Sequence, residues 1–184
     1  MKKVLSIIAL IAIFYSINAQ DKFFTKSGNI TFISKGSLET IEANHKAVTC
    51  VLDLKTGNLA FAVLMKGFEF EKALMQEHFN ENYVESHKFP KAEFKGNVIN
   101  NEEVNYSKDG TYPVNVKGKL TLHGETKDAE TNGIVVIKGG KIQATSAFNI
   151  LLSDYKIEIP KIVKDNVTNS VKIEVNCKLE PLKS

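Results

Sequence analysis

Carboxylate and imidazole side chains gather in one segment where they could do chemistry together. Glu77, Glu81 and Glu85 recur at every fourth residue, and His78 lies beside the first of them. Carboxylates on one helix face, next to a histidine, could coordinate a divalent cation. His78, however, falls one position away from the acidic stripe, on the side of Leu74. An acidic outer face is common on an amphipathic helix, so we expect a solvated face and no metal site.

A second candidate is His123, which ends a strongly alternating segment and precedes Gly124. It could hold the polar end of a ligand. The pattern favours the alternative, in which His123 lies on the solvent-facing phase and makes a hydrogen bond in a turn. The sequence contains no Gly-x-Ser-x-Gly, Ser-x-x-Lys or His-Glu-x-x-His motif. We therefore expect no catalysis and no cofactor.

Composition limits the partners. The formal net charge is only +3, and acidic and basic residues are interspersed without a basic stripe, so we expect no nucleic-acid partner. Cys50 and Cys177 are the two cysteines. They could pair in an oxidising compartment, but two cysteines in a domain of this size are not a disulfide scaffold. Whether they form a bridge stays open.

The N-terminus has the pattern of an export signal. Two lysines precede an apolar run from Val4 to Ile17, and Ala19 offers a small side chain for cleavage. The run is short for a membrane span, which needs about 20 apolar residues. We expect a signal peptide over residues 1–19, a single domain over residues 20–184, a periplasmic or secreted location and no stable membrane anchor.

Most of the mature chain alternates between apolar and polar residues, as from Val171 to Leu179. This alternation predicts strands with one buried and one wet face. The expected strands cover residues 29–33, 45–54, 59–66, 92–99, 112–123, 133–138, 142–151 and 167–179. Short turns such as Gly139-Gly140 join them, which indicates a sandwich or a closed antiparallel barrel.

One helix interrupts the strands. In residues 71–86, Leu74, Met75, Phe79 and Tyr83 fall at helical spacing. The strand over residues 59–66 is apolar on both faces. We therefore expect the helix to cover the outer face of this strand.

Small residues occupy the inward phase of several strands: Gly118, Ala144, Ser146 and Cys177. An eight-stranded barrel is wide enough either to be filled by its own side chains or to hold one slender ligand. Small inward residues favour a cavity, whereas small and large residues in alternation would also fill a tapering barrel. By the same phase, both cysteines are expected to face the interior.

Three segments around the helix form a set of motifs. They are Lys66-Gly67-Phe68 with Phe70, followed by Met75-Gln76-Glu77-His78-Phe79-Asn80, then Phe89-Pro90-Lys91-Ala92-Glu93-Phe94-Lys95-Gly96, and last Lys117-Gly118-Lys119-Leu120-Thr121-Leu122-His123-Gly124-Glu125-Thr126-Lys127. In this order, within a likeness that spans about Gly28 to Leu182, they resemble the YceI-like family, also called the polyisoprenoid-binding YceI-like family.

The resemblance implies an exported bacterial protein of the all-β class. Its expected fold is a lipocalin-like antiparallel eight-stranded β-barrel with one inserted α-helix. In some members the barrel encloses an extended isoprenoid or another long-chain amphiphile. Membership implies neither catalysis nor a cofactor.

Two functions follow as hypotheses. In the first, the barrel of an exported protein holds a long-chain hydrophobic ligand such as a polyisoprenoid. The expected ligand-binding wall, chosen by strand phase, is Phe61, Val63, Met65, Val116, Gly118, Leu120, Ala144, Ser146, Phe148, Val175 and Cys177. In the second, the barrel is filled by its own side chains and acts as a structural or interaction protein through its outer surface.

The export signal predicts a processed N-terminus. We expect N-terminal sequencing of the protein, purified from outside the cytoplasm, to begin at or next to Gln20, because cleavage follows a small residue. Purified protein that still begins at Met1 would contradict this prediction.

Overall fold

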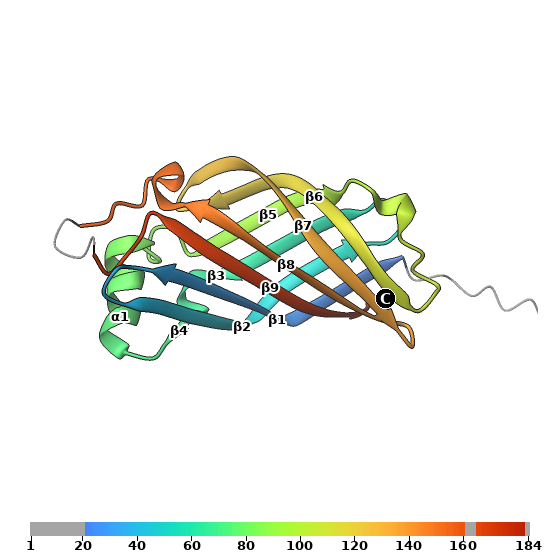
Figure 1. Cartoon of the computed structure of the whole chain (residues 1–184), viewed down its shortest axis with the longest axis horizontal. Coiled ribbons are helices and arrows are strands. Elements are labelled where there is room, and N and C mark those ends of the chain that lie inside the picture. The colour runs from blue at the N-terminus through green and yellow to red at the C-terminus, as the bar shows by residue number, and fades with distance from the viewer. Residues whose placement is uncertain (1–20, 161–164, 183–184) are drawn as a thin grey trace, which may run out of the picture.

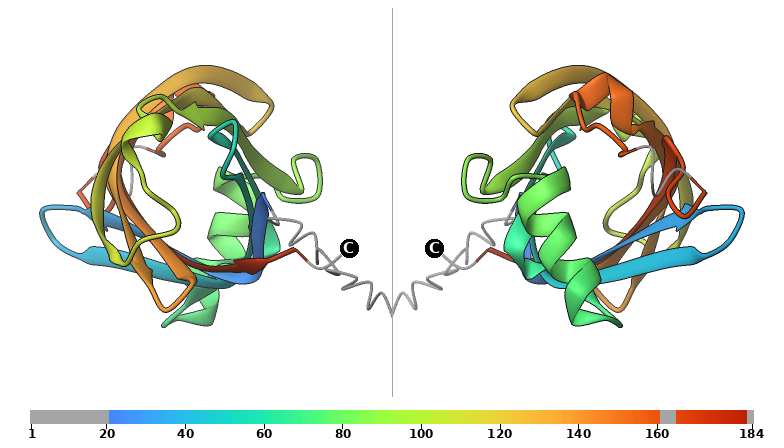
Figure 2. Two further views of the ribbon diagram at one scale, coloured as in Figure 1. Left: turned by 90° about the vertical axis from the view of Figure 1, so that its right-hand side faces the viewer. Right: turned by 90° about the vertical axis from the view of Figure 1, so that its left-hand side faces the viewer.

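Eight antiparallel strands close into a barrel in the computed structural model, which describes residues 21–160 and 165–182 (Figure 1). The order around the ring is β1-β9-β8-β7-β6-β5-β3-β2, and the pairing of β1 with β2 closes it. The barrel strands are β1 (Lys22–Lys35), β2 (Thr40–Asp53), β3 (Asn58–Leu64), β5 (Lys91–Val98), β6 (Gly110–Leu122), β7 (Glu125–Lys138), β8 (Lys141–Leu151) and β9 (Ser170–Pro181). Figure 2 shows the ring end-on.

The expected all-β fold with an eight-stranded antiparallel barrel is thereby confirmed. Its strands alternate as their sequences predict: in β9, for example, Val171 and Leu179 are buried while Lys172 is exposed. The tight turn between β7 and β8 places Gly139 and Gly140 at φ values of 56° and 73°, which glycine adopts readily. The signal peptide expected over residues 1–19 lies outside the described residues and stays a prediction.

Three strands begin well before the sequence pattern predicts. β1 begins at Lys22 rather than at residue 29, β2 at Thr40 rather than at residue 45, and β7 at Glu125 rather than at residue 133. The first half of β7, residues 125–132, is polar on both phases and therefore carries no alternation. It forms a strand because it pairs along its whole length with β6.

Apolar side chains fill the two ends of the barrel separately. One core gathers where β2 turns into β3, β5 into β6 and β7 into β8, and it contains Leu52, Val98 and Ile137. The segment between β5 and β6 closes this end, since Val104 is buried in the same core and the Tyr106 hydroxyl donates a hydrogen bond to Asn101 Oδ1 at 2.9 Å. Burial raises the pKa of Tyr106 to about 12.

The helix closes the opposite end. α1 (Ala73–His78) continues into a π-helical turn over Phe79–Tyr83 and lies across the end of the barrel (Figure 2). The expectation that it covers the outer face of β3 is wrong, because Ala60, Ala62 and Leu64 remain exposed there. Leu74, expected on the buried side, is 61% exposed. The helix is a cap rather than an outer layer.

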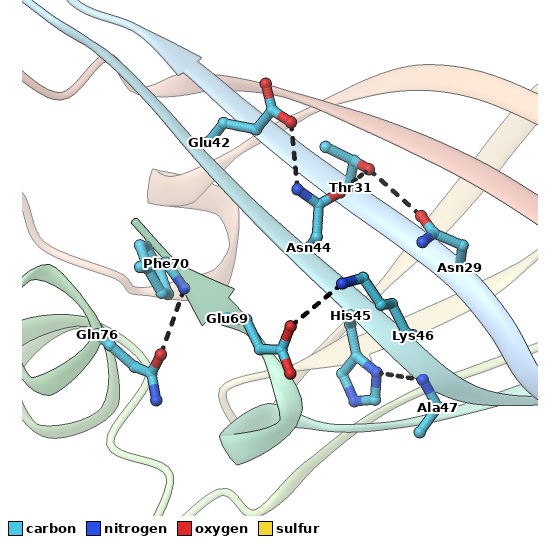
Figure 3. A network of polar contacts seen from close by, with 10 residues as sticks. All are labelled: Asn29, Thr31, Glu42, Asn44, His45, Lys46, Ala47, Glu69, Phe70 and Gln76. Carbon is cyan, nitrogen blue, oxygen red and sulfur yellow. Dashed lines mark hydrogen bonds and ion pairs between the residues drawn. The ribbon is translucent and has the colours of Figure 1, made fainter. Parts of the chain in front are cut away.

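Polar contacts on β2 attach this cap to the barrel (Figure 3). The two-residue strand β4 (Glu69–Phe70) pairs with β2, and Lys46 of β2 forms an exposed ion pair with Glu69 at 3.5 Å. The backbone N–H of Phe70 donates to Gln76 Oε1 of α1 at 3.3 Å. The chain is therefore connected from β2 through β4 to the helix.

His45 supports the same region from inside. Its side chain is buried, its Nδ1 accepts a hydrogen bond from the backbone N–H of Ala47 at 3.1 Å, and its Nε2 donates to the Leu64 carbonyl at 2.9 Å. These partners require the neutral tautomer with its proton on Nε2. A Cβ at Gly67 would lie only 2.2 Å from that nitrogen, so glycine is needed for this close approach.

His123 connects three loops at the capped end. Its Nδ1 donates to the Tyr155 carbonyl at 3.0 Å, and its Nε2 lies 3.1 Å from the Glu85 carboxylate. Both ring nitrogens therefore face acceptor oxygens, so an N–H on either nitrogen has a partner. The expectation that His123 lies on a solvent-facing phase is wrong, since its side chain is only 10% exposed. His123 and Glu85 both hold positive φ values, 51° and 42°, a strained state that these contacts stabilise.

We expect Glu85→Gln to lower the free energy of unfolding near neutral pH, because it removes the charge that attracts Lys88 and His123. The Lys88 ammonium and then His123 hold the pKa of the Glu85 carboxyl below its ordinary value of 4.5. A carboxyl with a lowered folded-state pKa adds stability above its unfolded-state pKa, and this contribution is lost as the pH falls through the folded value.

Urea unfolding of both proteins over a pH series tests this prediction. The difference between wild type and Glu85→Gln should narrow as the pH falls below 4.5. Glu77→Gln, at an exposed position of α1, is the matched control and should change little at any pH. A Glu85→Gln difference that persists unchanged in acid would contradict the ion-pair role.

Candidate ligand cavity

A cavity of about 410 Å³ runs inside the barrel. All eight barrel strands contribute apolar side chains to its wall, and the cap contributes Met75, Phe79 and Tyr83. This volume lies within the range of about 300–1,000 Å³ that small-molecule sites occupy. The interior is therefore filled at its ends and hollow between them.

Most of the wall expected from strand phase lies around this cavity. The predicted residues that line it are Phe61, Val63, Met65, Val116, Leu120, Ala144, Ser146, Phe148 and Val175. Gly118 and Cys177 face the interior but are not part of the lining. Whether any of these residues contacts a ligand stays a prediction.

Gly118 is small for a reason other than ligand passage. It faces Gly96 across the β5–β6 ladder, and a Cβ at Gly118 would lie 2.4 Å from the Lys95 carbonyl oxygen and 2.7 Å from Cζ of Phe94. The Phe94 ring thus packs over both glycines and fills the space that their side chains would take. The Gly96–Gly118 pair thus permits close packing of the wall, which explains the small residue without a ligand, and a ligand contact at Gly118 stays an untested prediction.

Cys177 is likewise part of the packed core. Both cysteines are fully buried, as expected, and they are free thiols. They belong to the same core cluster. The sulfur of Cys177 lies 2.7 Å from where a Cβ at Gly28 would stand. The neighbouring Cys177 and then burial raise the pKa of the Cys50 thiol. Since both thiols are fully buried, we expect both to react slowly in the folded protein.

A cluster of aromatic rings forms the roof of the cavity and was not part of the predicted wall. Phe32 of β1 lies 5.4 to 5.5 Å from the rings of Phe68, Phe70 and Phe79. These rings line the cavity directly beneath α1. Aromatic pairs at this spacing contribute packing energy beyond their buried area. Phe68 and Phe70 belong to the first of the three family motifs, and this was the sequence signal that could have indicated the aromatic cluster.

Polar lining groups at the capped end are already paired. The Glu39 carboxylate accepts from Lys72 at 2.7 Å and from Asn166 Nδ2 at 3.4 Å. The Lys72 hydrogen bond is the main reason that the pKa of Glu39 is lowered. His78 also lines the cavity at this end. These groups make the capped end polar at its rim and apolar below it.

The acidic stripe of the cap does not form a metal centre in the structure. Glu85 turns away to His123 and Lys88, while Glu77 and Glu81 are exposed. Over residues 21–160 and 165–182, no three His, Cys, Asp or Glu side chains are grouped so that they could hold a metal ion. The same residues include no helix with the length and apolarity needed to cross a membrane.

The cavity can therefore bind an apolar chain by excluding water. Its wall presents carbon over most of its length, and the carboxylates that line it, Glu39, Glu93 and Glu130, each have an ion-pair partner. Such a site gains affinity from buried apolar area rather than from charge.

Comparisons with known proteins agree with this geometry. The chain superposes on a polyisoprenoid-binding domain from Saccharophagus degradans implicated in plant cell wall breakdown, with a TM-score of 0.76 and 13% identity over 88% of this chain and 99% of that one. It superposes on BcnA of Burkholderia cenocepacia with a TM-score of 0.68 and 16% identity, over 83% of this chain and 96% of that one. For a YceI protein of Campylobacter jejuni the TM-score is 0.59 and the identity 18%, over 77% of this chain and 85% of that one. At these identities the likeness shows the fold alone.

The amino-acid sequence itself identifies the family. Among curated protein sequences none matches this chain. The family model of the YceI-like domain, in contrast, matches residues 15–179, which is most of the chain. Fold, cavity and family model coincide over the same residues, and the chain belongs to the family of YceI-like domains.

Proposed function

We propose that this chain is an exported binding protein, without catalytic activity, that holds the hydrocarbon tail of one isoprenoid or other long-chain amphiphile in its barrel. The observation that carries the proposal is the apolar cavity of about 410 Å³ between two packed ends. We would not expect a cavity of this volume in a barrel that is filled by its own side chains. Export is inferred from the two lysines and the apolar run before Ala19.

Apolar burial supplies the affinity in this proposal. Each CH₂ group moved out of water contributes about 0.8 kcal/mol, so a tail of about ten such groups would contribute roughly 8 kcal/mol. Loss of translational and rotational freedom opposes this gain. A long tail is therefore needed, and the elongated cavity suits one.

The nature of the tail is suggested by similarity. The related domain from Saccharophagus degradans is named for polyisoprenoid binding, and the aromatic roof formed by Phe32, Phe68, Phe70 and Phe79 offers flat faces to a branched, unsaturated chain. An isoprenoid is therefore our first choice, and a fatty chain is the second.

We expect Ala144→Leu to weaken binding about tenfold or more. The larger side chain projects into the cavity and would displace about two CH₂ groups of the tail, each of which contributes about 0.8 kcal/mol of binding free energy. Ala144 lines the cavity, so the larger side chain enters empty space and the urea midpoint of the ligand-free protein should change little. The assay is fluorescence titration with a polyene fatty acid and with farnesol as competitor. Ala62→Leu, at an exposed position of β3, is the matched control and should bind like wild type.

The structural or interaction barrel predicts the opposite result. In a barrel without a ligand site, wild type would bind neither probe, and Ala144→Leu would overpack the interior at a cost of about 1–3 kcal/mol. That combination would contradict the proposed function.

A further inference from the structure

The barrel wall is open between β7 and β8 along half of its length. β7 pairs with β6 from Glu125 onward, and β8 pairs with β9 as far as Leu151. β7 and β8 pair with each other only from the Gly133–Ser146 pair to the turn. Residues 125–132 and 147–151 therefore face each other without a ladder. Figure 1 shows β7 arching away from β8 toward the end that carries α1.

The cavity extends into this opening. Inward residues from both strands line it, and so do outward residues of both: Glu130 in the unpaired part of β7, and Ile134 of β7 with Thr145 of β8, which are paired next to the end of the ladder. Ile134 is 46% exposed on the outer surface. A cavity that touches both phases of two neighbouring strands passes through the wall between them.

Fixed contacts bound the opening at both ends. At the end of the opening next to the β7–β8 ladder, the Ser146 hydroxyl donates to the Asn132 carbonyl at 2.7 Å and lies 3.0 Å from the Thr131 hydroxyl. At the end of the opening nearer to the cap, Lys156 pairs with Glu125 at 2.6 Å, beside the contact of His123 with Tyr155. We call the opening between these contacts the side window.

Over the described residues, the cavity lining at the side window is polar and contains no lysine or arginine. Hydroxyl groups of Thr131, Thr145 and Ser146 surround it, and strand edges without a partner strand present peptide groups that need hydrogen bonds. Glu130 is the charged residue of the lining, and it pairs with Lys117 at 3.4 Å. Of the lysines at the edges of the opening, Lys156 pairs with Glu125, and Lys127 is exposed and lies outside the cavity lining.

The capped end is less suited to receive a polar group. Glu39 there is already bonded to Lys72 and Asn166, and the aromatic roof lies directly below. A head group that binds Glu39 would compete with these partners. At the side window the hydroxyls of Thr131 and Ser146 also have partners, namely each other and the Asn132 carbonyl, but the neighbouring strand edges have no partner strand.

We propose that the side window is where the polar, uncharged end of the bound amphiphile, an alcohol or a carbonyl group, leaves the barrel. This inference rests on the proposed function and assigns the orientation of the ligand: the tail lies along the barrel axis and the head hydrogen-bonds at Thr131, Thr145 and Ser146.

The window itself is tested without a ligand. Ser146 of β8 faces Val175 of β9 in register, and both side chains line the cavity. A bulky maleimide should label Ser146→Cys about tenfold or more faster than Val175→Cys, because only the first lies at an opening, while the native buried thiols stay unlabelled. Equal rates would overturn the proposal, whatever the protein binds.

The head position is tested with methyl stearate that carries a nitroxide near either its ester end or its methyl end. A fluorophore on Ile134→Cys, which is exposed beside the window and opposite Thr145, should be quenched several-fold more strongly by the ester-end probe than by the methyl-end probe. A fluorophore on Leu74→Cys, at the exposed surface of the cap, should not show this preference.

The outcomes separate the two proposals. Stronger ester-end quenching at Leu74→Cys, or no preference at either position, would overturn the side window as the head-group exit while the binding function stands. Rapid labelling of Ser146→Cys with no binding of either probe would overturn the proposed function, and the head-group assignment with it.

Discussion

The width of a closed eight-stranded barrel is the constraint on which the rest of the molecule depends. Such a ring is too wide for small side chains to fill and just wide enough for one slender ligand. Here the two ends are packed by separate cores, and the middle keeps a cavity of about 410 Å³. Small residues permit close packing at Gly96 and Gly118, whereas at Ala144 and Ser146 they border the cavity.

The cap and the loops around it depend on a few polar contacts. β4 and Gln76 attach α1 to β2, and His123 joins the segments that contain Glu85 and Tyr155. These contacts close one end of the barrel, while β7 and β8 stay unpaired with each other over residues 125–132 and 147–151. The packing thus retains an apolar interior and still provides polar groups at its edge, as a protein that holds an amphiphile requires.

The features that could be predicted from the sequence are those that depend on local periodicity, namely the strands and the direction of their side chains. Alternation correctly oriented Phe61, Val116 and Val175 toward the interior, because side-chain direction in a strand has a period of two. It could not show that Gly118 faces Gly96, since register between strands is a tertiary property, nor that residues 125–132 form a strand, since they are polar on both phases. The partners of His123 lie more than thirty residues away in the chain on either side, so only the fold brings them together.

The central claim is that the space inside the barrel belongs to a bound long-chain molecule. Mass spectrometry of the organic extract from protein purified without detergent tests it most directly, because a tightly held lipid co-purifies with the folded chain. We expect one long-chain hydrophobic species per protein molecule, released when the protein is unfolded. An extract from the folded protein that contains no such species at a stoichiometric level would contradict the claim.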